Sequence, residues 1–165
     1  MGASLNVIVQ HQLTPSEIVS LDGLVIDPIF DGRKATPVKW ENPNINANSL
    51  VDGWSKISDH YTENPWAGGD LPILENEEIS IFVWTPSLFS ITPYFRPSFY
   101  RSDELTRNKF NTIVAKFAKT VKATDVIIIE DWYVWEAFDE HIGLTVVEIK
   151  KGVIAKNLPY FEIDF

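Results

Sequence analysis

The sequence predicts one α+β domain over residues 1–165, in which two or three helices pack on a mostly antiparallel sheet. Three observations lead to this fold class. The chain of 165 residues is 45% hydrophobic, which is enough for one core. Segments of strand type and of helix type are mixed without the strict alternation that is typical of parallel sheets. Residues 103–122 carry apolar side chains at helical spacing, and no internal repeat is visible.

The chain begins with a segment typical of a strand followed by a short helix. Residues 4–10 are rich in Val and Ile, which favours a strand. Thr14 can cap the helix, Pro15 suits its first position, and Glu17 completes a capping box. Gly23 is expected to follow the end of this helix.

A loop and a second helix are expected next. Four turn-forming dipeptides with Pro or Gly break up residues 24–48, so we expect a loop with a brief strand at 37–40. Either Asn48 or Ser49 can cap the second helix, and Pro65 should stop the chain from continuing it. The apolar face of this helix comprises Leu50, Trp54, Ile57 and Tyr61.

The middle of the chain contains two strand candidates. Residues 65–78 are expected to be a loop, and residues 78–86 form the first strand candidate, with the sequence EISIFVWTP. The second candidate covers residues 90–100. Pro93 and Pro97 within it indicate an edge strand or a broken one.

The C-terminal part begins with the most distinct helix of the sequence. Residues 103–122 form that helix, with Ser102 as the expected cap and lysines near its C-terminal end. Residues 124–130 predict a strand that is covered on both faces, because four consecutive apolar residues leave no polar side. We expect residues 144–157 to form a hairpin that turns at KKG, and residues 160–165 to add a last strand.

The net charge of −9 is unevenly distributed along the chain. Residues 41–79 hold eight acids and one base, residues 96–122 hold seven bases and two acids, and residues 124–148 hold seven acids and no base. One basic block cannot neutralise two acidic blocks, so negative charge is expected to face solvent or a partner. This charge disfavours nucleic acid as a partner.

Other features exclude several classes of protein. No stretch approaches the roughly 18 apolar residues of a membrane span, so no membrane partner is predicted. The chain has no cysteine, which excludes disulfides and thiolate metal sites and suits a reducing, cytoplasmic location. Phosphate-loop, dinucleotide and hydrolase motifs are absent, and we predict no cofactor. His60 and Glu63 would supply only two ligands on one helix face, so no metal site is predicted.

The segment IIIEDWYVWEAFDEHIG, residues 127–143, combines a buried strand with carboxylates and aromatic side chains. Aromatic anchors beside unpaired acids are typical of a contact patch for a basic protein. The residues LENEE at 74–78 and the acidic second helix are expected to extend this surface. The predicted partner-binding residues are Glu130, Asp131, Trp132, Trp135, Glu136, Asp139 and Glu140.

These observations favour a non-catalytic binding protein. A small acidic domain with exposed aromatic residues has the general character of an immunity or inhibitor protein that covers a basic toxin or effector enzyme. Two alternatives stay open. A small enzyme would use Glu130, Asp131 and His141 for acid/base work, with or without a metal. A structural or assembly subunit, for example a homodimer, would bury the aromatic residues between copies.

Overall fold

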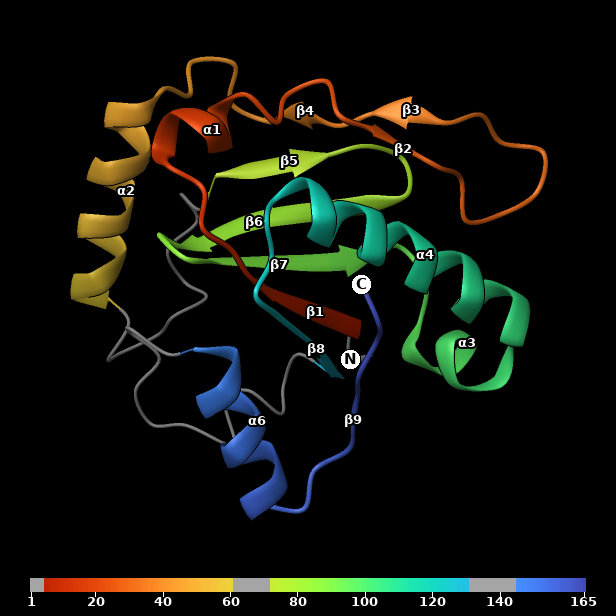
Figure 1. Ribbon diagram of the computed structural model, residues 1–165. Coiled ribbons are helices and arrows are strands. Elements are labelled where there is room, and N and C mark those ends of the chain that lie inside the picture. Colours follow the sequence, from red (N-terminus) through yellow and green to blue (C-terminus); the bar gives the residue numbers. More distant parts are fainter. Residues whose placement is uncertain (1–4, 61–71, 131–144) are drawn as a thin grey trace.

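The computed structural model describes residues 5–60, 72–130 and 145–165, with the backbone alone for residues 55–60. Its centre is an antiparallel sheet of seven strands in the order β4-β5-β6-β7-β1-β8-β9 (Figure 1). These strands are β1 Leu5–Gln10, β4 Lys39–Trp40, β5 Ile73–Glu75, β6 Ile79–Thr85, β7 Leu88–Pro93, β8 Asp125–Glu130 and β9 Tyr160–Phe161. The α+β class and the mostly antiparallel sheet are therefore confirmed.

The remaining elements are a small hairpin and five helices within the described residues. The hairpin consists of β2 Val25–Ile26 and β3 Thr36–Pro37. The helices are α1 Pro15–Val19, α2 Ala47–His60, α3 Pro97–Ser102, α4 Glu104–Thr120 and α6 Val146–Ala155. Within the same residues, no helix has the length and apolar character that crossing a bilayer requires.

The two faces of the sheet carry separate clusters of buried side chains. The larger cluster joins alternate residues of the central strands to α1, α2 and α4, with Val7 and Val9 of β1 among its members. The smaller cluster places α6 against the other face, where Ile8 of β1 and Trp84 of β6 are buried. Because β1 contributes to both clusters, it is covered on both sides, as a central strand should be.

The start of the chain has the predicted local structure. Thr14 caps α1 and Glu17 returns the capping-box bond, with distances of 3.2 and 3.1 Å between donor and acceptor atoms. Gly23 adopts φ +90°, a left-handed conformation that favours glycine. The second helix differs in its cap. Asn46 exchanges hydrogen bonds with Ser49, and α2 therefore begins at Ala47 instead of after Asn48 or Ser49.

The predictions for the middle of the chain need two corrections. Residues 65–78 were expected to be a loop, but β5 lies within them and buries Leu74 between β4 and β6. The strand candidate at 90–100 ends at Pro93, and Pro97 then opens α3. Proline suits the first turn of a helix because no intrahelical partner is needed for its missing N–H.

The largest correction concerns the expected hairpin at 144–157, which is instead the helix α6. Thr145 caps it by accepting the N–H of Glu148 at 3.2 Å. Val146, Ile149 and Val153 are buried at helical spacing. The many β-branched residues of this segment favoured a strand, but tertiary packing outweighs that weak preference.

The other C-terminal elements agree more closely with the sequence. Helix α4 and strand β8 fall within the predicted ranges, and β9 covers the first two residues of the last predicted strand. Ser102 does not cap α4, because its hydroxyl donates to the carbonyl of Ser98 at 2.7 Å inside α3. Asp103 occupies the cap position and accepts a hydrogen bond from the Thr106 hydroxyl at 2.5 Å.

Two glycines provide a matched test of this backbone. Gly53 lies inside α2, and a methyl group added there meets no atom within 4 Å. Gly53→Ala should therefore raise the free energy of unfolding by about 0.5–1 kcal/mol, because alanine loses less entropy in a helix. A methyl group added at Gly23 also meets no atom within 4 Å, but φ is +90° there, so Gly23→Ala should lower the free energy of unfolding by about 1 kcal/mol. Urea denaturation measures both free energies of unfolding. Effects of equal sign would contradict the helical conformation of Gly53 or the left-handed conformation of Gly23.

Candidate functional site

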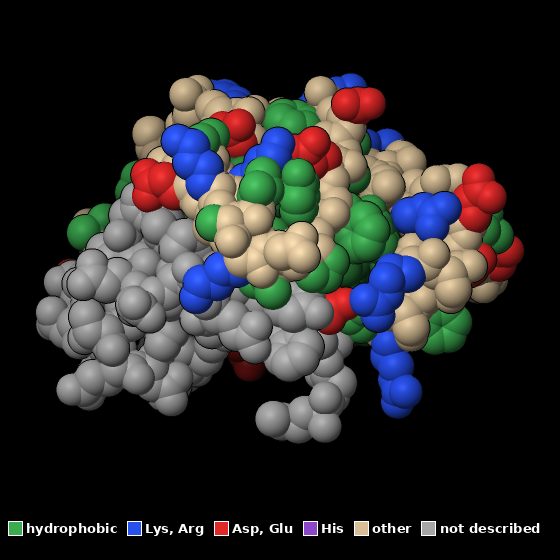
Figure 2. All heavy atoms as spheres, turned by 90° about the horizontal axis from the view of Figure 1, so that it is seen from below, with side chains coloured by type: hydrophobic (Ala, Val, Ile, Leu, Met, Phe, Trp, Pro, Cys, Tyr) green, Lys and Arg blue, Asp and Glu red, His purple; other side chains and the backbone are tan. Residues whose placement is uncertain are grey.

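The basic block of residues 96–122 is paired mainly with acids near the N-terminus. On α4, Lys109 contacts Asp31 and Lys116 contacts Asp27, each at 2.6 Å, and just after α4 Lys122 contacts Glu17 at 3.2 Å. These three acids lie outside both acidic blocks of the sequence. Figure 2 shows one face of the molecule, on which several Lys and Arg side chains lie beside an acidic side chain. Among the residues with described side chains, the basic block forms an ion pair with only one acid of the acidic blocks.

Glu130 is the exception, because it is buried at the end of β8 and forms an ion pair with Arg101 of α3. With 8% of its surface exposed, it offers little area to a partner or substrate. The other six predicted contact residues lie outside the described residues, as does His141. They are Asp131, Trp132, Trp135, Glu136, Asp139 and Glu140.

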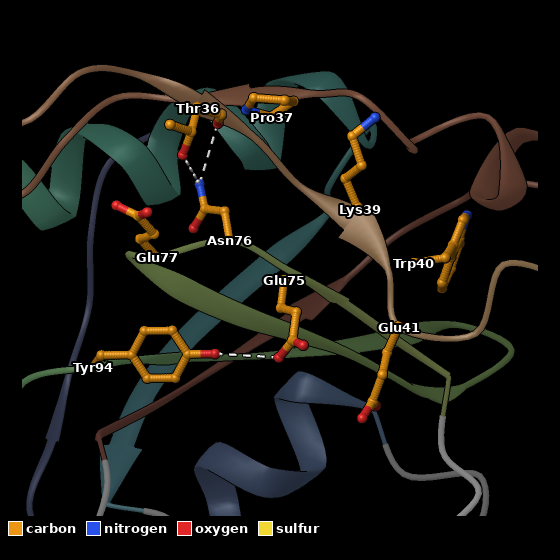
Figure 3. Close-up of a pocket in the computed structure, with 9 residues that line it drawn as sticks. All are labelled: Thr36, Pro37, Lys39, Trp40, Glu41, Glu75, Asn76, Glu77 and Tyr94. Carbon is orange, nitrogen blue, oxygen red and sulfur yellow. Dashed lines mark hydrogen bonds between the residues drawn. The ribbon is translucent and has the colours of Figure 1, made fainter.

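A groove with a volume of about 520 Å³ lies where β4 and β5 meet. We call it the acidic groove, and its principal residues are Trp40, Glu41, Glu75, Glu77 and Tyr94. The carboxylates of Glu41 and Glu75 turn toward the same side and the hydroxyl of Tyr94 points to Glu75, whereas Glu77 and Lys39 point away from them (Figure 3). Within the described residues, no Lys or Arg side chain forms an ion pair with Glu41, Glu75 or Glu77.

Strand pairing brings these residues together from distant parts of the sequence. Lys39 of β4 lies opposite Glu75 of β5, and the N–H of Glu41 donates to the carbonyl of Ile73 at 2.9 Å. Glu75 in turn lies opposite Ser80 of β6. The sheet thus holds two carboxylates near each other at its β4 edge, Glu41 directly after β4 and Glu75 at the end of β5.

Tyr94 follows β7 and adds an aromatic ring to the groove. Its hydroxyl lies 2.5 Å from the hydroxyl of Ser80 and donates to a carboxylate oxygen of Glu75 at 3.3 Å. Partial burial, together with the negative charges of Glu75 and Glu41, raises the pKa of Tyr94 above its usual value, although the Ser80 bond opposes this shift. The phenol therefore stays neutral and donates a hydrogen bond at physiological pH. Tyr94 is 55% exposed, so much of its ring is open to contact.

Trp40 is held in place by hydrogen bonds outside the groove. Its indole N–H donates to the carbonyl of Val19 at 3.1 Å, and its backbone N–H donates to Asp22 at 3.1 Å. Asn76 fixes the neighbouring turn through bonds of 3.2 Å to the carbonyl and hydroxyl of Thr36. Hydrogen bonds to the surrounding fold therefore fix two of the residues that line the groove.

Glu78, next to the groove, has a structural role. It is 2% exposed and accepts hydrogen bonds from the N–H of Ile29 and the guanidinium of Arg33, both at 3.3 Å. Glu78→Ala should lower the free energy of unfolding by about 2 kcal/mol, because a buried N–H loses its partner while half-exposed Arg33 returns to water. Glu78→Gln keeps one side-chain oxygen that can accept the N–H of Ile29, so it should lower the free energy of unfolding by less than Glu78→Ala does. Urea denaturation of both variants checks this, and equal losses would contradict the role of the acceptor.

The acidic groove can attract and hold a cationic group, but it lacks the usual arrangement of a metal centre. Among the described residues, no group of three or more His, Asp or Glu side chains is placed to bind a metal ion. The sequence LENEE at 74–78 indicated Glu75 and Glu77. Sequence reasoning missed Trp40, Glu41 and Tyr94, because only the pairing of β4 with β5 and the position of the chain after β7 bring them close.

Comparison with known proteins found no match to a family model, to a curated protein or to a solved structure.

Proposed function

We propose that this protein is a non-catalytic binding protein that holds a basic surface of a partner protein in the acidic groove, and that it acts as an inhibitor or immunity protein. One observation carries the proposal. Glu41, Glu75 and Glu77 lie in one groove without an ion pair from the described residues, beside the exposed ring of Tyr94. Carboxylates around an aromatic ring suit a partner Arg or Lys side chain.

Two further features support a basic protein as the partner. The net charge of −9 attracts cationic proteins over distances comparable to the Debye length, which speeds their association. Lys109, Lys116 and Lys122 are paired within the fold, so they oppose this attraction less than free lysines would. A toxin or effector enzyme with a cationic active site is the kind of partner that this surface would cover and inhibit.

The experiment is capture of a partner from the source cells at low ionic strength with three forms of the protein. The first is the natural protein, and the second carries Glu41→Lys, Glu75→Lys and Glu77→Lys. The control carries reversals at three exposed acids outside the groove, Asp52, Glu104 and Asp164. Each set of three reversals changes the net charge from −9 to −3. We expect the natural protein and the control to capture a basic protein that the groove variant does not, and to inhibit its activity. Equal capture by both variants would contradict the proposal.

A further inference from the structure

The outer edge of β2 has backbone groups that the described residues leave unbonded. Val25 lies opposite Pro37 of β3, and Pro37 has no N–H. This pair is therefore of the non-hydrogen-bonded kind, and the N–H and carbonyl of Val25 point away from β3. The bond from the N–H of Val38 to the carbonyl of Leu24, at 2.8 Å, fits this alternation.

A groove with a volume of about 320 Å³ separates this edge from α4. We call it the β2–α4 groove. Its apolar lining includes Leu24, Val25, Ile113 and Phe117, and two lysines, Lys116 and Lys119, also line it. Val25 is 58% exposed, whereas Ile113 and Phe117 are almost fully buried. The volume is near the lower end of the range of about 300–1,000 Å³ for ligand pockets, so the groove suits a short segment.

The charge of this groove is opposite to that of the whole protein. Lys116 is paired with Asp27 at 2.6 Å, so these two charges offset each other. Lys119 is exposed and forms no ion pair within the described residues. The unmatched charge at the groove is therefore positive, and it favours a carboxylate.

We propose that the β2–α4 groove binds an extended, acidic segment of a partner protein, which adds to β2 as a further strand. The N–H and carbonyl of Val25 would exchange hydrogen bonds with the segment. Because side chains alternate along a strand, apolar residues of the segment would face the exposed side chain of Val25 while a carboxylate reaches Lys119. Lysines near an open strand edge also deter unspecific pairing, and here they select an acidic strand over a basic one. This site is separate from the acidic groove and does not rest on the function proposed for it.

Two peptides test the inference by nuclear magnetic resonance on the isotope-labelled protein. The probe is a seven-residue peptide of alternating glutamate and valine with blocked ends, and the control replaces its glutamates by lysine. We expect the acidic peptide to shift the amide signals of residues 24–27 and 116–120 and to bind at least tenfold more tightly than the control. Two N-methylated forms of the acidic peptide extend this test, one methylated at its odd-numbered residues and one at its even-numbered residues. Only one of them should fail to bind, because only every second N–H of the added strand donates to β2.

Variants of the protein complete the test. Val25→Pro removes the outward N–H and should abolish binding, whereas Val25→Thr keeps this group and should bind normally. Lys119→Glu should weaken binding at least tenfold, and Lys151→Glu on α6, far from the groove, should leave it unchanged. Denaturation curves establish that each variant is folded. The inference is overturned if the acidic peptide shifts none of these signals, if both peptides bind equally, or if Lys119→Glu binds like the natural protein.

Discussion

Reversing the three carboxylates of the acidic groove should slow association with the proposed basic partner about a hundredfold, which lies within the range of 10–10³ for electrostatic steering. The variant carries Glu41→Lys, Glu75→Lys and Glu77→Lys. Replacing attraction by repulsion at the contact removes the local field that orients the partner, and it removes the partners of its Arg and Lys side chains. Stopped-flow or surface-binding kinetics at several salt concentrations provide the association rate.

The control for this prediction separates local contact from total charge. The variant with reversals at Asp52, Glu104 and Asp164 has the same net charge, and it should slow association by less than tenfold. For the natural protein, the association rate should fall as salt rises from about 0.01 to 0.15 M, since the Debye length shortens from about 30 to 8 Å. Similar rates for the two variants would show that the groove has no special part in binding.

Acid should destabilise the fold through His11, by up to about 3 kcal/mol between pH 6.5 and pH 4. His11 is 4% exposed, stacks on Phe89 at 4.2 Å, and accepts the N–H of Leu13 through Nδ1 at 3.0 Å. Burial lowers the pKa of His11 from 6.5 to about 4. Between these values the unfolded chain binds the proton and the folded chain does not. The free energy of unfolding is therefore unaffected by the titration of His11 above pH 6.5, and it decreases as the pH falls from 6.5 toward 4.

His11→Asn isolates this effect from other titrations. Asparagine can accept the N–H two residues further on, so it can keep the bond to Leu13, but it does not titrate. The variant should have a lower free energy of unfolding at pH 7, because the ring contact with Phe89 is lost. Its dependence on pH between 6.5 and 4 should be flatter. Urea denaturation at half-unit pH steps measures this, and identical slopes would refute the assignment to His11.

The reliable predictions from the sequence were those that local chemistry decides. Thr14, Pro15 and Glu17 specify α1 within a few residues, and the structure contains that capping box. Residues 103–122 are long enough for helical periodicity to be unambiguous. The segment at 144–157 was different, because its β-branched residues favour strands while the spacing of its buried positions is helical. Only the core that it packs against, which includes Ile8 and Trp84, decides between the two.

The candidate site was predictable only in part. Acidic composition indicated a surface for a basic partner, and LENEE supplied Glu75 and Glu77. Composition does not tell which acids the chain neutralises itself. Glu130 was expected at the contact surface, yet it is buried against Arg101, while Glu41 joins the groove directly after a strand of two residues. Which acids line the groove and which are neutralised depends on contacts between segments that are distant in the sequence, and no short motif encodes these contacts.

The most direct test of the account maps the surface that a cationic probe contacts. The labelled protein is titrated with a short arginine-rich peptide, and the changes in its amide signals are compared between the natural protein and the groove variant. The account predicts that the largest changes fall on residues 39–41, 75–77 and 94, and that they disappear when Glu41, Glu75 and Glu77 are replaced by lysine. Largest changes elsewhere in the chain, or equal changes in the groove variant, would contradict it.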